Sequence, residues 1–354
     1  PHEIVSSIVL LKCFSDNLTT IFHKKKYDLD LEFMVRAIMG ITYSSTHDNA
    51  ISLKNCFIKL LKSSSIGVDK VDFITRDSQV SGYDNVIVDT NRLLNAISPF
   101  AYKNKKDEYE LILAFNKTAL SVIQNVVMSR NSLYTWIYSH HKVKYEAYLI
   151  EESINTIAKI KYPESSQAQD KFIFKTFCTS NIIDNLFCDD DIWCLLKEHK
   201  DHKDIKEIFE RSSQKAAIWK SYAEFKSYFH ENDKDLKIGD FSTDNLRAIA
   251  NAKEGQAQKE FLEYLRKYKD LNIDFGIIPT SIKLSTIEHN AILIILNDRL
   301  YGFDVLLNEL HQNYSIKGFF YIYCDNKLKQ QIDKDEFVNY IKAYPSFRLI
   351  PPSR

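Results

Sequence analysis

A ten-residue run in the first third of the chain gathers acids and bases at helical spacing. The run Val68–Asp77 (VDKVDFITRD) holds three aspartates, one lysine and one arginine. Spacings of three, four and seven residues place Asp69, Asp72 and Arg76 on one side of a helix. Carboxylates can hold divalent cations, and lysine or arginine binds phosphate oxygens through charge-assisted hydrogen bonds. The exposed face of an ordinary surface helix shows the same mixture of charges, so the run needs context.

A second cluster, Arg130–His141 (RNSLYTWIYSHH), follows about sixty residues later. The two runs read D-x-x-D-aromatic-x-x-R-D, then a polar stretch with glycine at 78–83, then R-N-S-L-x-x-x-x-Y-x-H. As a pair they resemble the HD-domain phosphohydrolases, specifically the dNTP triphosphohydrolase (dGTPase-like) branch. Either run alone would be a weak signal.

The resemblance implies a metal-dependent hydrolase. In that family a metal-activated water attacks the α-phosphorus of a deoxynucleoside triphosphate and releases the nucleoside and triphosphate. The ligands are a first His, an adjacent His-Asp pair and a distant Asp, and Asp69 matches the distant Asp. The ion would be Mg, Mn, Fe or Zn. The one His-Asp pair, His47-Asp48, stands too close to Asp69 and is interpreted as coincidental, so we expect the sequence to begin after the other ligands.

Further roles follow from the resemblance, residue by residue. His2 resembles a later His that acts near the α-phosphate, which makes it the candidate catalytic residue. Lys70 and Arg130 match positions that contact the triphosphate. Asp77 and Tyr138 match the pair that binds the sugar 3′-hydroxyl.

Two positions depart from the family pattern. Phe73 stands where the family usually has Tyr, and Tyr134 stands where some relatives carry a His near the phosphates; both are kept as candidate substrate-binding residues. Structural roles are expected for other residues of the two runs. Arg76 should pair with a helix acid such as Asp72, Trp136 and Ile137 should lie in the core, and His140 and His141 should be structural.

Composition describes an ordinary globular protein. The 354 residues are 45% hydrophobic and 27% charged, with only 8 Gly and 7 Pro, which predicts a largely helical chain. The chain has 47 Lys and Arg residues and 47 Asp and Glu residues. This balance of charge does not indicate a nucleic-acid partner, although such a partner is possible. Six cysteines without CxxC spacing predict reduced core thiols and a cytoplasmic protein. No apolar run is judged long enough to span a bilayer, so no membrane partner is expected. By the resemblance we expect a homo-oligomer, a dimer or higher.

The elements expected to carry these residues are mostly helices. Apolar periodicity predicts helices at 2–23 with a break near 15–17, 30–43, 51–62, 68–80, 89–98 and 108–127. An extended piece is expected at 109–115, since a small β element precedes the R-N-S-L helix in the resembled family. A long helix should then run from about Leu120 to Lys159. Asp189–Asp191 should open a helix rather than hold a metal.

The expected fold is mostly α: an HD-domain helical bundle, further helices and a small C-terminal α+β unit, for which a ferredoxin-like arrangement is one form. The predicted domains are 1–160, containing the C-terminal part of the catalytic domain, 171–270, a helical extension, and 271–354, the α+β unit. Polar stretches at 160–171 and 229–257 suggest the linkers. Short β-branched and aromatic runs predict the C-terminal strands, with a hairpin turn at Asn297–Arg299.

Two alternatives stay open. The chain could be a catalytically inactive HD-fold subunit that binds a nucleotide or a regulatory partner. It could also be an HD phosphodiesterase acting on nucleic acid or a cyclic nucleotide.

Overall fold

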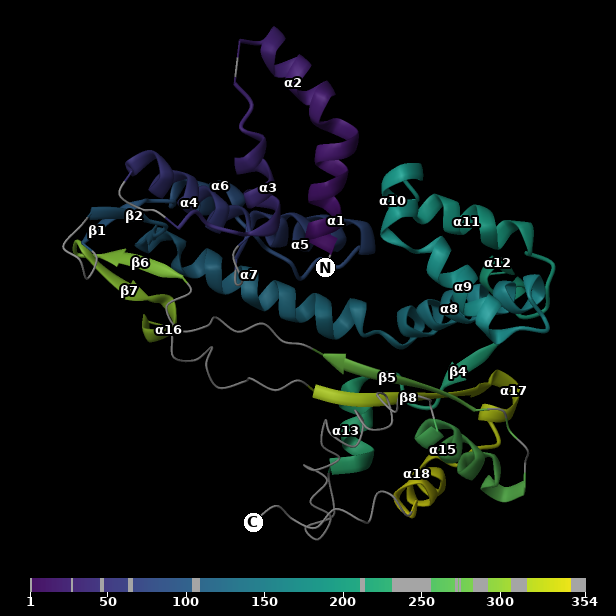
Figure 1. Cartoon of the computed structure of the whole chain (residues 1–354). Coiled ribbons are helices and arrows are strands. Elements are labelled where there is room, and N and C mark those ends of the chain that lie inside the picture. The colour runs from purple at the N-terminus through teal and green to yellow at the C-terminus, as the bar shows by residue number, and fades with distance from the viewer. Residues whose placement is uncertain are drawn as a thin grey trace. The chain divides into compact units, whose positions relative to one another are not determined.

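The structure is a computed structural model that describes residues 2–26, 28–44, 48–62, 66–103, 109–210, 214–230, 256–270, 273, 275–282, 292–306 and 317–344. The described residues are mainly helical, with a small sheet-containing region toward the C-terminus, as predicted (Figure 1). They group into two compact units. The first comprises Pro1–Leu133, Phe174–Cys188 and Leu284–Tyr314; the second comprises Tyr134–Ile173, Asp189–Lys283 and Ser315–Arg354. This grouping differs from the three predicted domains, which stay a prediction.

The first unit begins with a helix that does not break where expected. Helix α1 (His2–Val9), a π-helical turn (Leu10–Phe14) and α2 (Ser15–Lys24) follow one another directly. The predicted break at 15–17 is wrong because the polar side chains bond back to the preceding turn. Ser15 Oγ donates to the Leu11 carbonyl at 2.7 Å, and Thr19 Oγ1 donates to the Ser15 carbonyl at 2.8 Å.

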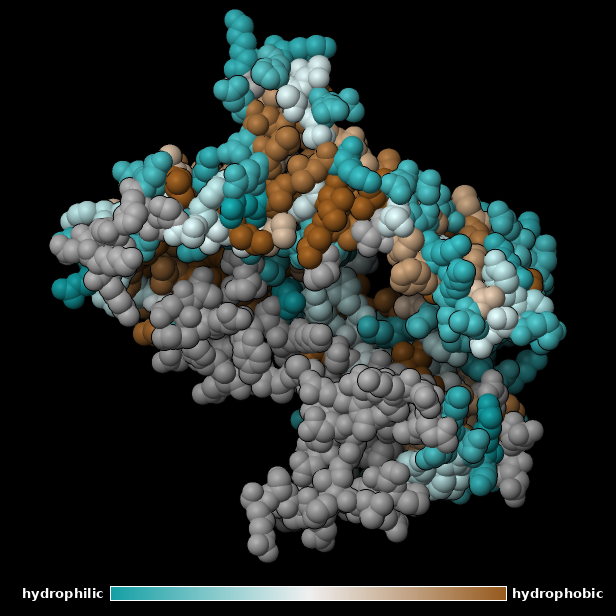
Figure 2. Space-filling view, viewed as in Figure 1, coloured by the Kyte–Doolittle hydropathy of each residue, from teal (hydrophilic) through white to brown (hydrophobic). Residues whose placement is uncertain are grey.

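This continuous helix also corrects the prediction about apolar length. His2–Lys24 is long and apolar enough to cross a membrane by length and composition, and 6% of its most apolar window is buried inside the protein. Ile4, Leu11, Phe14 and Ile21 are exposed on it, and Figure 2 shows apolar residues gathered over α1 to α3. Within its unit the helix still has partners. It packs against α3 and α10, and Lys12 Nζ lies 3.4 Å from Asp184 Oδ1.

Side-chain caps start the next two helices. Helix α3 (Leu31–Met39) begins at Asp30, whose carboxylate accepts from the Phe33 amide at 2.9 Å, and ends at Gly40, where φ is +72°. Helix α4 (Asn49–Leu61) begins at Asp48, whose carboxylate accepts from the Ala50 amide at 2.7 Å. Asp48 therefore caps a helix, while its neighbour His47 lies outside the described residues.

Helices α5 and α7 form the centre of this unit. Helix α5 (Val68–Ser81) covers the first charged run, and α6 (Thr90–Asn95) starts at the predicted cap, Asp89. Helix α7 (Leu120–Leu133) packs on α5 and carries the second run as far as Leu133. Ile74 of α5 and Ile123 of α7 are fully buried. Helix α5 and the part of the second run that lies on α7 are therefore packed together within this unit.

Small strands flank these helices. The expected hairpin before α7 is confirmed, because β1 (Phe100–Lys103) and β2 (Tyr109–Ile112) pair antiparallel beside α4 (Figure 1). The short strand β3 (Phe115–Asn116) pairs in parallel with β6 (Leu293–Leu296), which forms a hairpin with β7 (Arg299–Gly302). Asn297 and Asp298 turn that hairpin with φ of 49° and 59°, which confirms the predicted turn. Helices α16 (Phe303–Leu306) and α10 (Thr179–Asn185) complete the unit.

The second unit starts at a helix interruption. A π-helical turn (Tyr134–Tyr138) ends at Ser139, and α8 (His141–Lys161) starts anew. The single helix predicted from Leu120 to Lys159 is therefore wrong. Two hydroxyls from strand β8 hold the interruption: Tyr321 Oη donates to the Ser139 carbonyl at 2.9 Å, and Tyr323 Oη donates to the His141 carbonyl at 2.6 Å.

A helical part of this unit surrounds a small core. Helix α9 (Ser166–Thr176) follows α8, then come α11 (Asp189–Glu198) and α12 (Lys206–Glu210). Ile157, Leu196 and Ile205 are fully buried together. Asp189, Asp190 and Asp191 lie in the first turn of α11, where they complement the helix dipole as predicted.

The other part of this unit is a three-stranded antiparallel sheet in the order β4 (Lys215–Ala217), β8 (Lys317–Asp325), β5 (Gly276–Ile282). Its helices are α13 (Tyr222–His230), α15 (Gln256–Arg266), α17 (Asn326–Lys329) and α18 (Lys334–Lys342). Its core is aromatic: Trp219 is fully buried and donates from Nε1 to the Phe320 carbonyl at 2.7 Å.

Two sequence predictions are corrected here. The strands of 271–354 belong to two separate three-stranded sheets, so the described residues do not form a ferredoxin-like sheet. All six cysteines are thiols outside any disulfide, but only Cys56 and Cys324 are buried, and Cys188 and Cys194 are exposed. The linker predicted at 229–257 lies almost wholly outside the described residues.

Candidate functional site

The first turn of α5 brings two predicted site residues into one ion-pair chain. Lys62, just after α4, places Nζ 3.0 Å from Asp69 Oδ2 and 3.5 Å from Glu3 Oε1. His2 Nε2 lies 3.1 Å from the same Glu3 oxygen. The candidate metal ligand Asp69 and the candidate catalytic His2 are thus linked through Glu3 and Lys62.

The pKa directions agree with a charged network. The pKa of Lys62 is raised, first by its hydrogen bond to Asp69 and then by the charges of Asp69 and Glu3, against the effect of burial. The pKa of Glu3 is lowered, first by a backbone hydrogen bond and then by the charges of His2 and Lys62. Sequence reasoning missed Lys62 and Glu3, since the contacts depend on how α1 and α4 pack rather than on a local pattern.

The donor set around Asp69 does not fit a divalent metal ion. Asp69 Oδ1 accepts from the Lys70 amide at 2.8 Å, and Oδ2 accepts from Lys62 Nζ at 3.0 Å. Both carboxylate oxygens are therefore engaged by donors. Among the described residues there is no group of three His, Cys, Asp or Glu side chains that could hold a metal. No reaction step through a metal can be built from these residues.

Cations, in contrast, gather at this end of α5. Burial is the main cause of the lowered pKa of Lys70; the charges of Arg130 and Lys62 lower it further, while Asp69 raises it. Arg130, on α7, is thus close enough for its charge to act on Lys70; the triphosphate contacts predicted for both residues stay predictions. Three cationic side chains (Lys62, Lys70 and Arg130) outnumber the two carboxylates, Asp69 and Glu3, so the site is net positive.

Farther along α5, one structural prediction is confirmed. Arg76 Nη1 lies 2.8 Å from Asp72 Oδ2, four residues earlier, so this arginine pairs with the helix acid. Arg76 Nε is also 3.7 Å from Asp77 Oδ1. Phe73 and Asp77 are half-buried on the same helix. The sugar contact predicted for Asp77 and the substrate contact predicted for Phe73 stay predictions.

The remaining motif residues belong to the second unit. The rings of Tyr134 and Tyr138 meet edge to face with centroids 5.0 Å apart, and their substrate roles stay predictions. Trp136 is 52% exposed in the chain, so its predicted place in the core is wrong; Ile137 is half-buried.

Both histidines at the end of the motif have structural contacts, as predicted. His140 Nδ1 accepts from the Lys142 amide at 3.3 Å and caps α8. His141 Nδ1 lies 3.1 Å from the Lys220 carbonyl. Burial is the main reason that the pKa of His141 falls to about 4, so its imidazole is neutral at pH 7.

Comparison with known proteins places the fold but not the family. No family model matches the chain, and no curated protein was found to match. A hypothetical protein from Aquifex aeolicus shares the fold with a TM-score of 0.50 and 15% identity, over 94% of this chain and 74% of that one. A phosphohydrolase from Bacteroides thetaiotaomicron VPI-5482 aligns with a TM-score of 0.43 and 14% identity, over 91% of this chain and 84% of that one. At 15% identity the likeness to the Aquifex aeolicus protein concerns the fold alone.

Proposed function

We propose that this protein is a phosphohydrolase of the HD type that acts on a deoxynucleoside triphosphate and releases the deoxynucleoside and triphosphate. The observation that carries the proposal is the placement of Lys70 near Lys62, Arg130 and Asp69, with Lys62 Nζ 3.0 Å from Asp69 Oδ2. Two of these cations come from the two sequence motifs, and they meet on packed helices although sixty residues separate them. Lysine and arginine so placed are suited to a triphosphate, which carries several negative charges.

The roles proposed within the first unit follow from this arrangement. Lys70 and Arg130 bind phosphate oxygens, Asp77 contacts the sugar 3′-hydroxyl, and Phe73 contacts the substrate. His2, on α1, is the candidate proton donor near the α-phosphate. Activation of the water would need a divalent metal whose ligands include residues other than Asp69, because one carboxylate does not hold such an ion.

A second candidate function is favoured by the state of Asp69. Its two oxygens accept from Lys62 and from the Lys70 amide. A carboxylate that is neutralised by an ammonium group has less to offer a metal ion. The same cations would still bind a nucleotide. The protein could therefore be a nucleotide-binding subunit without hydrolysis.

The decisive experiment incubates the purified full-length protein with Mn²⁺ and each of the four dNTPs and measures released triphosphate by ion-exchange chromatography. We expect triphosphate from at least one dNTP. Lys70→Gln should reduce kcat/KM by about tenfold or more, because a charge-assisted phosphate contact contributes roughly 1.5–3 kcal/mol. Lys59→Gln is the matched control, since Lys59 is an exposed lysine on α4 one turn before Lys62.

The outcomes separate the candidates. Triphosphate release that depends on Lys70 but not on Lys59 supports the hydrolase. Binding of a dNTP that weakens in Lys70→Gln, with no product from any dNTP, supports the nucleotide-binding subunit. An Asp69→Ala variant with full activity would show that the role of Asp69 is wrong. Equal activity of wild type and Lys70→Gln would contradict the phosphate site.

A further inference from the structure

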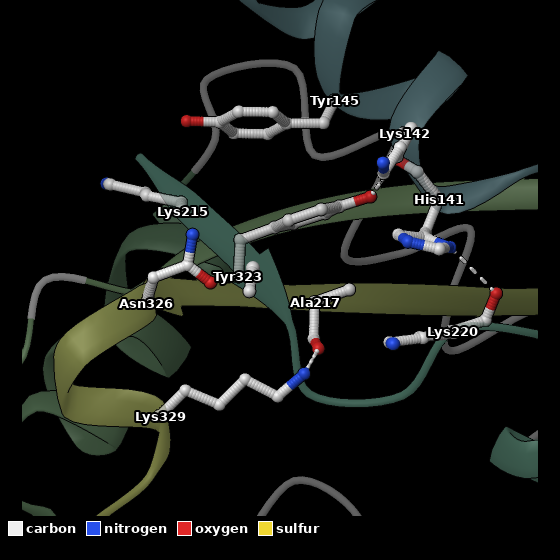
Figure 3. A pocket seen from close by; sticks show the side chains of 10 residues that line it. His141, Lys142, Tyr145, Lys215, Ala217, Lys220, Tyr323, Asn326 and Lys329 are labelled. Carbon is white, nitrogen blue, oxygen red and sulfur yellow. Dashed lines mark hydrogen bonds between the residues drawn. The ribbon is translucent and has the colours of Figure 1, made fainter. Parts of the chain in front are cut away.

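A cavity lies wholly within the second unit. The first turn of α8, strands β4 and β8, and α17 surround it (Figure 3). Its volume is about 360 Å³, near the lower end of the range of roughly 300–1,000 Å³ for small-molecule sites. Tyr323 lies in the middle of the lining, and its ring stacks on Tyr145 with centroids 4.9 Å apart. The cavity therefore has the size of a small-molecule site and an aromatic wall.

Four lysines from separate elements line this cavity. They are Lys142 on α8, Lys215 on β4, Lys220 just after β4, and Lys329 on α17. Figure 3 shows Lys142, Lys220 and Lys329 around the ring of Tyr323. None of the ten described residues that line the cavity is an Asp or Glu. Such a gathering of like charge is unfavourable without an anion nearby.

Contacts inside the unit hold these cations in place. Lys329 Nζ donates to the Ala217 carbonyl at 2.5 Å. Its pKa is lowered, mainly by burial and next by the charge of Lys220. The Lys220 backbone is fixed at both ends, because its amide donates to Glu224 Oε2 at 2.7 Å and its carbonyl meets His141 Nδ1. Lys329 and the backbone of Lys220 are therefore positioned before any ligand arrives.

Two carboxylates touch lining residues, but other donors engage them. Glu207 Oε1 accepts from Tyr145 Oη at 3.1 Å and from the Gln214 amide at 2.7 Å. Glu224 Oε1 accepts from Lys334 Nζ at 2.7 Å, besides the bond from Lys220 to its other oxygen. Gln214 and Lys334, which do not line the cavity, therefore engage both acids.

His141 adds a hydrogen-bonding group without adding charge. Its neutral imidazole must donate from Nδ1 to the Lys220 carbonyl, because a carbonyl oxygen only accepts. That tautomer leaves Nε2 as an acceptor. The lining thus combines several cations with a neutral acceptor, as suits a phosphorylated ligand that also carries a hydroxyl or amino group.

We propose that this cavity binds a small molecule with two or more phosphate groups, at a site separate from the nucleotide site proposed in the first unit. Several ammonium groups match an anion with several charges, and lysine binds phosphate as a point charge. The volume suits a small molecule rather than a nucleic-acid duplex or a protein helix. Inorganic triphosphate and nucleoside polyphosphates share this chemistry, so the experiment must distinguish them.

The test is isothermal titration calorimetry on the full chain without added metal, using inorganic triphosphate and, separately, ATP. The double variant Lys142→Gln/Lys220→Gln removes two exposed cations of the lining. It keeps the hydrogen bonds of the Lys220 backbone. We expect the affinity of this double variant to fall about tenfold or more. Lys327→Gln is the matched control, because Lys327 is exposed on the same short helix as Lys329 and does not line the cavity.

A third variant separates this site from the one in the first unit. The Lys70→Gln variant should still bind triphosphate and ATP at the cavity of the second unit, where the double variant loses affinity. This expectation does not depend on the result of the hydrolysis assay. Binding of both probes identifies the polyphosphate as the recognised group, and binding of ATP alone adds the nucleoside. Unchanged binding in the double variant, or loss only in Lys70→Gln, would overturn the proposal. So would tight binding of a single-stranded oligonucleotide with no response to either probe. Should the double variant unfold, the single variant Lys220→Gln gives the same comparison.

Discussion

The interruption between Tyr138 and His141 gives a sharp test of the fold, through the variant Tyr321→Phe. Tyr321 is buried, and its hydroxyl donates to the carbonyl of Ser139, which is itself only 3% exposed. The first helical bond of α8 runs from the Lys144 amide to the His140 carbonyl. The Ser139 carbonyl therefore lies outside the α8 ladder and depends on Tyr321. Removing the hydroxyl leaves a buried acceptor unsatisfied, at a cost of about 1–3 kcal/mol.

Urea unfolding followed by tryptophan fluorescence measures this loss. The three tryptophans of the chain, Trp136, Trp193 and Trp219, all belong to the second unit, so the signal reports on that unit. Tyr162→Phe is the control, because Tyr162 is 42% exposed at the end of α8 and should change stability by less than about 0.5 kcal/mol. A Tyr321→Phe variant as stable as wild type, or a control that loses as much, would refute the reasoning.

Two further predictions concern stability. Alkaline pH should destabilise the second unit: burial is the main cause that raises the pKa of Tyr321 and Tyr323 above the ordinary value, so the folded state disfavours their ionisation. Their contribution to stability is complete below the unfolded pKa of about 10 and is lost as the pH rises above it. The urea midpoint of unfolding should therefore fall between pH 8 and 11, and it should fall less in Tyr321→Phe. An equal fall of the midpoint in both proteins would contradict this prediction. Ile74→Ala should destabilise the first unit by about 2–5 kcal/mol, since Ile74 is fully buried on α5. The control is Val80→Ala, at an 84% exposed position of the same helix, which should reduce stability by less than about 0.5 kcal/mol. Urea unfolding followed by circular dichroism gives both free energies. Similar losses in the two variants would show that burial of Ile74 does not stabilise α5.

Local patterns determined much of the first unit. The helical spacing at 68–80 predicted α5 within one residue, and Asp89 capped α6 as expected. The turn at Asn297–Asp298 followed from residues that tolerate positive φ. These features depend on neighbours in sequence, so the sequence alone suffices for them.

Membrane-spanning length and helix continuity were harder to predict. The polar residues at 15–17 read as a break, yet Ser15 and Thr19 bond to carbonyls of the preceding turn and the helix continues. The motif helix, which looked continuous, is interrupted at Ser139. There the apolar periodicity persists across the extended backbone of His140, so the pattern carries no sign of the interruption.

Part of the candidate site was predicted from the sequence, and part of it became visible only in the structure. Residue types at Lys70, Asp69 and Arg130 indicated phosphate chemistry from the sequence, through their resemblance to a family motif. Only the tertiary structure added Lys62, whose pairing with Asp69 argues against a metal on the described residues, and Glu3, which pairs with Lys62.

The sequence by itself determined which segments become helices and turns and which residue types could bind a triphosphate. The tertiary structure decided the partners. The Tyr321 hydroxyl bonds to the carbonyl of Ser139, 182 residues away in sequence. The lysines that line the cavity of the second unit come from α8, β4, the segment after β4 and α17. Such contacts depend on how distant segments pack, and no spacing along the chain encodes them.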